Sequence, residues 1–393
     1  MHSRIPYRPA LLVICAASTI IVCANVARGQ FIDDPALEAH IQKGITLLYN
    51  LSFAGAESEF QEVVRAKPDH PAGHFFLAGV EWWKILIEVE NTTRDEGFIT
   101  LLDKVIDLCD KKLDQNEDDV TALFFKGGAL GFRGRLHANR DDWLKAASDG
   151  RSALPIIQKA YKLAPNNYDV LLGMGIYNYY AEVIPDKYPI VKPLVIFFPR
   201  GDKQKGILQL QQASEKAAYA NTEAAYFLLQ LYYNYERRYA EALPLAMNLF
   251  KRFPDNVVFH KYVGRLSSSL GKMEEMKQTF QEILDSVKKK KTGYNESTER
   301  EARYYLGLYE MNTQKYDAAL EHFYRCDELS RALDRDGASG FMTMTNLKIG
   351  MVYDLQKKRD IAVTQYGKVL KMTDYQDAHK QAEKYLKTPY GSF

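Results

Sequence analysis

Two small residues, an aromatic ring and a proline recur at fixed distances along this chain. The first set is Gly44, Ala56, Phe60 and Pro68, at offsets of 0, 12, 16 and 24 residues. The same ladder, with one or two steps altered or missing, starts again at Gln230, Gly264, Gly307 and Gly350. A repeat unit of this size cannot bury its apolar face alone, so stacked neighbours must supply the core. The ladder therefore constrains the architecture of most of the chain.

This spacing resembles the tetratricopeptide repeat (TPR), a helix–turn–helix unit of about 34 residues in which small residues let two helices cross closely. The resemblance covers residues 37–386. It implies an all-α fold: a TPR-like α-solenoid, a right-handed superhelix of about eight helix pairs over residues 30–387, with a C-terminal tail at 388–393. Residues 375–386 are expected to form an end-capping helix. One irregularity is expected at residues 133–149, a link longer than a normal turn.

A shorter stretch resembles the middle of the inclusion-body-clearance family, TPR proteins with long helices and a Gly-Asp insertion. The stretch starts at Gly175, continues through Ile184-Pro185, and ends with Phe197–Ile207. This chain differs from that family because it has a candidate export signal and lacks the extra N-terminal region. The resemblance therefore implies architecture and no cellular role.

Residues 1–29 have the pattern of an export signal. Arg4 and Arg8 precede an uncharged stretch that runs to Ala27, and Ala27-Arg28-Gly29 places small residues at the −3 and −1 positions of a cleavage site. The mature chain would start at Gln30. An uncleaved membrane anchor is the alternative, because the stretch approaches the ~18 apolar residues of a spanning helix. The pattern predicts an exported protein, periplasmic or envelope-associated.

Charge and cysteine content narrow the functional classes. The net charge is +2, from 52 basic and 50 acidic residues. This balance gives no electrostatic reason to expect a nucleic-acid ligand. Beyond the signal the chain has two cysteines, Cys109 and Cys326, which we expect to be buried and unpaired.

No catalytic, cofactor or metal motif stands out in the sequence. His70 and His74 have a spacing that could place two imidazoles on one helical face, but Pro71 between them puts His70 in the preceding turn. The carboxylates of Asp141 and Asp142 are expected at a helix start, where the helix dipole favours them. The prediction is a non-enzymatic protein without cofactor or metal.

The most unusual region is a proline-rich insertion at residues 182–205. Its four prolines, from Pro185 to Pro199, surround the apolar run 194–198 and prevent one regular helix. The run either packs into the inner face of the solenoid as a plug or forms a docking loop. A third interpretation is a membrane-dipping hairpin over residues 188–199.

The helix register predicts which residues line the concave face. On the helix that contains Met174 they are Leu172, Ile176 and Tyr179. The six predicted partner-binding residues are Tyr179, Phe227, Asn234, Lys261, Arg265 and Tyr304. Aromatic rings beside two cations suit an acidic or C-terminal peptide segment.

The leading hypothesis is an exported TPR scaffold or adaptor that binds a protein or peptide in its concave groove, in cell-envelope assembly. The alternative is an envelope protein that binds a small molecule, glycan or lipid in a pocket between the insertion and the groove. The oligomeric state stays open.

Overall fold

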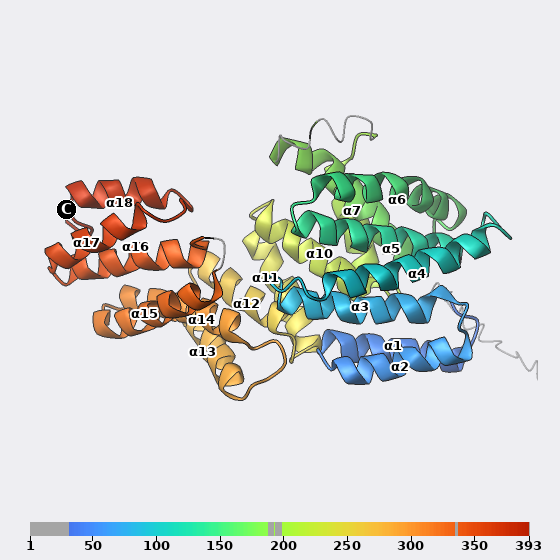
Figure 1. The fold of residues 1–393 in the computed structure, drawn as a ribbon, viewed down its shortest axis with the longest axis horizontal. Coiled ribbons are helices and arrows are strands. Elements are labelled where there is room, and N and C mark those ends of the chain that lie inside the picture. Colours follow the sequence, from blue (N-terminus) through green and yellow to red (C-terminus); the bar gives the residue numbers. More distant parts are fainter. Residues whose placement is uncertain (1–30, 188–191, 193–198, 335–336, 393) are drawn as a thin grey trace, which may run out of the picture.

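The computed structural model describes residues 31–187, 192, 199–334 and 337–392. Within these residues the chain forms 17 helices and no strand (Figure 1). The all-α, TPR-like fold predicted from the ladder is confirmed. The export signal and the apolar run 194–198 lie outside the described residues, and so do the plug, docking-loop and membrane interpretations of that run.

Eight successive helix pairs make up the described part of the solenoid. The first four are α1 (Pro35–Tyr49) with α2 (Phe53–Ala66), α3 (Pro71–Ile87) with α4 (Asp95–Leu113), α5 (Val120–Asn139) with α6 (Trp143–Leu163), and α7 (Tyr168–Lys187) with α9 (Lys203–Lys216). The next four are α10 (Asn221–Asn234) with α11 (Tyr239–Arg252), α12 (Val257–Ser269) with α13 (Met273–Lys288), α14 (Glu296–Asn312) with α15 (Tyr316–Leu333), and α16 (Gly340–Leu355) with α17 (Arg359–Val369). The short helix α18 (Ala378–Lys387) follows the last pair.

Side-chain caps set the start of many helices. Asp119, Asp142 and Asp202 each accept a hydrogen bond from a backbone N–H in the first turn of the helix that follows. His70 does the same for α3, so it lies in the turn before that helix, as predicted. Each such cap stabilises its helix by about 0.5–2 kcal/mol.

The ladder residues hold the two helices of a pair together. In four pairs a glycine of the first helix lies against the ring sixteen residues later: Gly44–Phe60, Gly264–Phe280, Gly307–Phe323 and Gly350–Tyr366. A Cβ at these glycines would lie 2.4 to 2.6 Å from the ring. That distance is shorter than any van der Waals contact, so the close crossing requires a residue without a side chain.

The first part of the solenoid closes on itself. The Nδ2 of Asn256, before α12, donates to the carbonyl of Tyr49 at the end of α1, at 2.8 Å. The Nδ2 of Asn295, before α14, donates to the carbonyl of Ile87 at the end of α3, at 3.2 Å. In a simple solenoid each repeat contacts only its neighbours. Here the first two pairs also contact the sixth and seventh, and we call α1–α13 the closed half.

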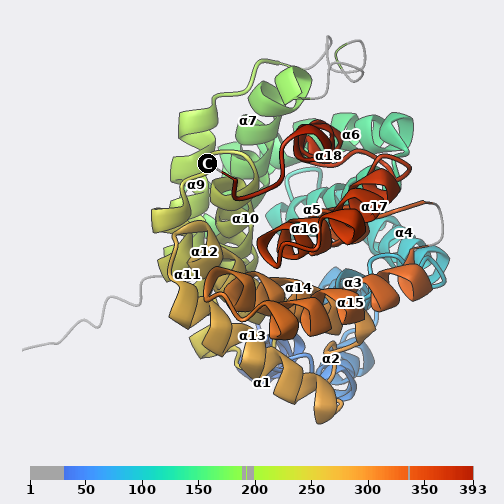
Figure 2. The same cartoon turned by 90° about the vertical axis from the view of Figure 1, so that its left-hand side faces the viewer.

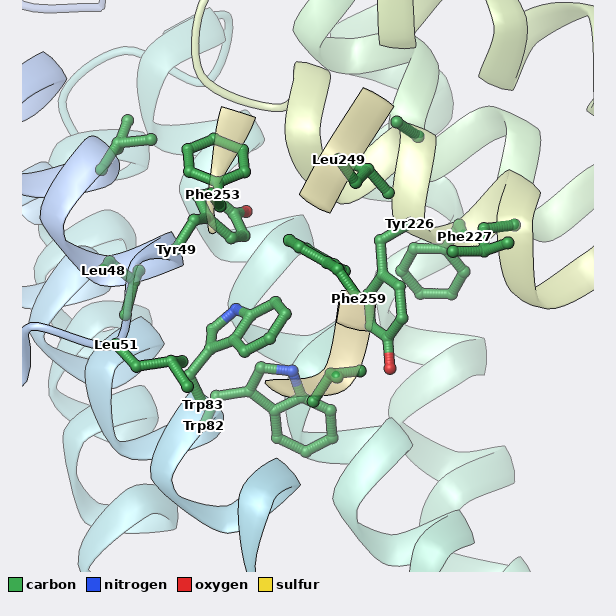
Figure 3. Close-up of a cluster of buried hydrophobic side chains, with 14 of the residues drawn as sticks. Leu48, Tyr49, Leu51, Trp82, Trp83, Tyr226, Phe227, Leu249, Phe253 and Phe259 are labelled. Carbon is green, nitrogen blue, oxygen red and sulfur yellow. The ribbon is translucent and has the colours of Figure 1, made fainter. Parts of the chain in front are cut away.

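An aromatic cluster buries the contact that closes this half (Figure 3). Tyr49 and Trp83, from the first two pairs, pack against Tyr226, Phe253 and Phe259 of the fifth and sixth. The Trp83 ring centroid lies 5.6 Å from those of both Tyr226 and Phe259. All five side chains are buried. Large buried aromatic side chains in such tilted and edge-to-face contacts contribute strongly to stability. This closing cluster therefore holds the first and last helices of the closed half together.

The last helices form an open stack, α15–α18, joined to the closed half through α14. Their core is separate and contains Phe323, Leu347 and Tyr366. Figure 1 places them at the left end of the molecule, and Figure 2, which faces that end, shows α16–α18 stacked next to α14 and α15. Each of these helices packs against its neighbours in sequence, as expected for a linear array.

Two boundaries differ from those predicted. Residues 133–149 do not form a long link, because α5 continues to Asn139 and α6 begins at Trp143. Arg133 on α5 binds Asp149 on α6, with Nε 3.0 Å from Oδ2, and this ion pair joins the two extended helices. The insertion is also shorter than 182–205. Helix α7 continues through Pro185, which lies in its last turn and so disturbs only that turn, and α9 starts at Lys203.

The described part of the chain contains no helix long and apolar enough to cross a membrane.

Candidate binding cavity

Closure of the first half leaves a cavity between the inner faces of its helices. The cavity has a volume of about 780 Å³. Its walls come from α1, α3, α4, α5, α6, α7 and α10. Ligand sites in proteins are typically clefts of about 300–1,000 Å³ with mainly apolar walls. The cavity therefore has the size and composition of a binding site.

Four glycines on α5 shape one wall: Gly127, Gly128, Gly131 and Gly134. A Cβ at Gly127 would lie 2.8 Å from Ile157, and one at Gly128 would lie 3.0 Å from Phe75. These two glycines let α5 approach its neighbours. A Cβ at Gly131 would meet no atom within 4 Å. The missing side chain at Gly131 thus leaves space inside the cavity.

Aromatic side chains form much of the remaining wall. Phe132 of α5 packs against Trp82 and Phe75 of α3, with ring centroids 5.6 and 5.9 Å apart. Tyr180 of α7 and Phe227 of α10 contribute rings from the other side. All three tryptophans of the chain line the cavity: Trp82, Trp83 and Trp143. Tryptophan fluorescence can therefore report its occupation.

A single guanidinium lies in this apolar setting. Arg135 Nη1 donates to Glu223 at 3.0 Å, and Nη2 donates to Gln230 at 3.0 Å. The guanidinium carbon lies 4.9 Å from the Trp82 ring centroid and 4.4 Å from that of Phe227. Glu223 is only 4% exposed. Burial raises the pKa of this carboxyl, while Arg135 acts in the opposite direction.

Two of the six predicted partner-binding residues, Phe227 and Asn234, line the cavity. Tyr179 is not a lining residue, and its hydroxyl donates to Glu236 at 2.7 Å. One row of α7 residues that line the cavity follows steps of four: Leu172, Ile176, Tyr180 and Ile184. Gly173 and Tyr177 line it from the adjacent row. The prediction took a step of three after Ile176, which selects the neighbouring side chain.

Lys261, Arg265 and Tyr304 lie farther along the solenoid, outside the residues that line the cavity. Arg265 Nη2 lies 2.6 Å from Glu301 Oε2, and Lys261 Nζ lies 3.6 Å from the same oxygen. Glu301 is 2% exposed, so one buried carboxylate already serves both cations. Burial lowers the pKa of Lys261. Tyr304 packs on Phe341, with centroids 5.7 Å apart. Partner binding by these residues stays a prediction.

Cys109 and Cys326 are both buried and free, as predicted. Burial raises the pKa of the Cys109 thiol to about 12 and that of Cys326 to about 11. Neither thiol is therefore a ready nucleophile at neutral pH. Among the residues that the structure describes, no group of three or more His, Cys, Asp or Glu side chains could hold a metal ion.

Comparisons with known proteins give structural neighbours only. No protein-family model and no curated protein matches this chain. PilF of Pseudomonas aeruginosa is similar over 66% of this chain and 96% of its own, at 12% identity and a TM-score of 0.42. A human IFIT1 dimer with PPP-AAAA is similar over 85% and 72%, at 14% identity and a TM-score of 0.45. A TPR protein of Thermus thermophilus is similar over 60% and 98%, at 15% identity and a TM-score of 0.36.

At these identities the likeness concerns the fold alone. The TPR-like character of the chain follows from its own helix pairs and their glycine–ring contacts. The resemblance to the inclusion-body-clearance family stays a prediction.

Proposed function

We propose that this protein is a non-enzymatic scaffold that holds an apolar segment of a protein partner in the inner cavity. The cavity between α1, α3–α7 and α10 carries this proposal. Removing apolar surface from water yields about 25 cal/mol per Å². A partner that fills the cavity with apolar side chains gains this term, and the surplus over the entropy lost on association sets the affinity.

The inner location of the cavity favours a segment over a flat protein surface. Five of its seven wall helices are the first helices of successive pairs (α1, α3, α5, α7 and α10), and first helices form the face that TPR-like solenoids turn inward. A folded domain cannot enter a space of about 780 Å³, whereas a few consecutive side chains can. The rest of the partner would then lie along the outside of the ring.

The decisive variant is Gly131→Leu. Because a Cβ at this position meets no atom within 4 Å, the leucine fills the cavity without a backbone clash. Gly97→Leu is the matched control, since Gly97 is exposed on α4 and its Cβ would also meet no atom within 4 Å. Both changes remove a helical glycine, so the gain in helix propensity is similar.

Mature wild-type protein and the two variants are immobilised and incubated with envelope extract. We expect a set of proteins that wild type and Gly97→Leu capture and Gly131→Leu loses. Equal capture by all three forms would show that the cavity is not the docking site.

We further propose that the scaffold is exported and acts in envelope assembly, which the signal pattern of residues 1–29 supports. The intact mass of the protein from an envelope fraction tests this. A chain that starts at Gln30 is expected, and a full-length cytosolic protein would refute the localisation.

A second candidate is the binding of a small apolar molecule or lipid. The closure of the ring favours it, because a cavity bounded by seven helices suits a compact ligand as well as a segment. Native mass spectrometry of the purified protein separates the two candidates. A bound mass below that of a peptide, kept by Gly97→Leu and absent from Gly131→Leu, would favour the small ligand.

A further inference from the structure

We infer that the cavity selects an apolar chain bearing a neutral carbonyl group, and that Arg135 recognises this carbonyl. The inference rests on the proposed function and adds the chemistry of the occupant. A protein partner supplies both parts at once, since an extended apolar segment carries a free carbonyl at every peptide bond.

The geometry of Arg135 provides the donor. Guanidinium has five N–H donors, and Glu223 and Gln230 accept from two of them. The side chain is 18% exposed and lines the cavity. The rings of Trp82 and Phe227 flank the guanidinium and cannot accept conventional hydrogen bonds. A carbonyl that enters the cavity with an apolar chain therefore finds a donor edge between apolar walls, where an unmade hydrogen bond is costly.

The charges around Arg135 exclude ionic occupants. Glu223 lies 3.0 Å from Nη1 and balances the charge of the guanidinium. An anion that approached Arg135 would also approach this buried carboxylate, and a cation would meet the guanidinium itself. In a setting of low dielectric these repulsions are large. A neutral acceptor meets neither repulsion.

The same argument selects the conformation of the bound segment. The carbonyls inside an α-helix already accept backbone hydrogen bonds. An extended segment keeps its carbonyls available to Arg135. We therefore place an extended apolar segment in the cavity, rather than an amphipathic helix.

Three probes with the same ten-carbon chain test this selection: decanamide, decanoate and decylammonium. Binding to the mature protein is followed by the fluorescence of Trp82, Trp83 and Trp143. Decanamide should bind roughly 3–10-fold more tightly than the other two, the effect of one net hydrogen bond. Gly131→Leu should abolish the binding of all three, and Gly97→Leu should bind them as wild type does.

The variant that removes the selection changes two residues together. Arg135→Met alone would leave Glu223 buried with only the Tyr49 hydroxyl as a donor and no counter-charge, which could prevent folding. The paired change Arg135→Met with Glu223→Gln removes both charges. We expect it to bind all three probes with similar affinity, provided its helical content by circular dichroism equals that of wild type. If it does not fold, Gln230→Leu, which frees Nη2, should keep or increase the preference for decanamide.

The outcomes separate the inference from the proposed function. Equal binding of the three probes, blocked by Gly131→Leu, would overturn the role of Arg135 and leave the apolar cavity as a site. A preference for decanamide that persists in the paired variant would also overturn it, as would the absence of binding by any probe. A further outcome would refute the proposed docking site alone. In it, wild type prefers decanamide and the paired variant does not, but Gly131→Leu captures the same partner proteins as wild type.

Discussion

The closed half and the open stack use the same repeat and reach different architectures. Gly44 meets Phe60 in the first pair as Gly350 meets Tyr366 in the last. The crossing of two helices within a pair is thus the same at both ends. What differs is Trp83, with its neighbour Tyr49, which packs across the ring against α10 and α12. The ladder sets the geometry of a helix pair, and a few large aromatic side chains determine whether the array of pairs closes on itself.

This difference predicts different cooperativity. In the open stack each pair depends on its neighbours, so helices can be lost one after another from the end. In the closed half, contacts of the first two pairs with the fifth and sixth pairs, and with Asn295 before α14, tie remote helices into one unit. Local stability should therefore rise from the C-terminus toward the closing cluster.

The largest effect is expected from Trp83→Ala. Removing this buried ring should lower the free energy of unfolding by about 3–5 kcal/mol. Hydrogen exchange should show lost protection in α1–α3 and also in α10–α12, on the far side of the ring. Phe323→Ala is the control, because its ring lies in the open stack and its loss of protection should stay within α14–α16. A Trp83→Ala effect confined to α3 and α4 would contradict the closure.

Acid should weaken the joint near α12. His260 is buried against Phe250, and its Nδ1 lies 3.0 Å from the Tyr294 hydroxyl. Burial, with a smaller contribution from the positive charge of Lys291, lowers the pKa of His260 to about 4. The carboxylate of Glu282 lies 3.6 Å from Nε2. The unfolded chain, with an ordinary histidine pKa, binds the proton first as pH falls below ~6.5.

Stability should therefore be full above pH ~6.5 and fall by about 2–4 kcal/mol toward pH ~4 through this group. Urea unfolding of wild type and His260→Gln across this range measures the difference. Since burial also lowers the pKa of His70 to about 4, part of the acid effect should persist in the variant. Identical pH slopes would contradict the assignment.

Gly350→Ala and Gly44→Ala test whether the glycine–ring contact contributes equally to stability in the two regions. A Cβ would lie 2.5 Å from Tyr366 in one case and 2.4 Å from Phe60 in the other. We expect each change to cost about 1–3 kcal/mol by overpacking. Gly131→Ala is the matched comparison, since it should stabilise by up to ~1 kcal/mol. Thermal melts decide, and a harmless Gly44→Ala would break the equivalence of the two regions.

The smallest expected effect comes from labelling the two native thiols, which requires no substitution. Cys109 lies in the closed half and Cys326 in the open stack, both buried. Under increasing urea, alkylation followed by peptide mass spectrometry should modify Cys326 before Cys109. Labelling of both at the same urea concentration would indicate a single cooperative unit.

Local features of the fold could be predicted from the sequence. The ladder located the helix pairs because each step is a short-range contact between helices adjacent in the chain. Asp142 and His70 were placed correctly at helix starts, since a cap needs only its own turn. Cys326 lies three residues after Phe323 and so on the same buried face of its helix, which makes its burial predictable from the ladder.

The closure and the cavity could not be predicted in this way. Tyr49 and Trp83 look in the sequence like ordinary core residues of their own pairs, and no periodicity marks a contact between helices so remote in the chain. The signal that sequence reasoning missed is the set of four closely spaced glycines on α5. Helix stability does not explain them, because glycine costs up to ~1 kcal/mol in a helix interior.

The helix register predicted that Lys261 and Arg265 lie together, but it did not predict the carboxylate that binds them. Lys261 and Arg265 share a helix face, but Glu301, 36 residues after Arg265, supplies the carboxylate. Changing both cations to alanine would leave Glu301 buried and unpaired, so that variant would lose stability as well as any binding.

The closing hydrogen bonds also impose an order on synthesis. The hydrogen bond to Tyr49 cannot form until Asn256, 207 residues later, has been synthesised. The one to Ile87 requires Asn295, 208 residues later. At about 5–20 residues per second, translation needs roughly 10–40 s to deliver these partners. During that interval the aromatic side of α1 and α3 has no permanent neighbour. The nascent chain should therefore be most vulnerable to aggregation before α12 emerges, and slowing translation downstream of α3 should lengthen that exposure.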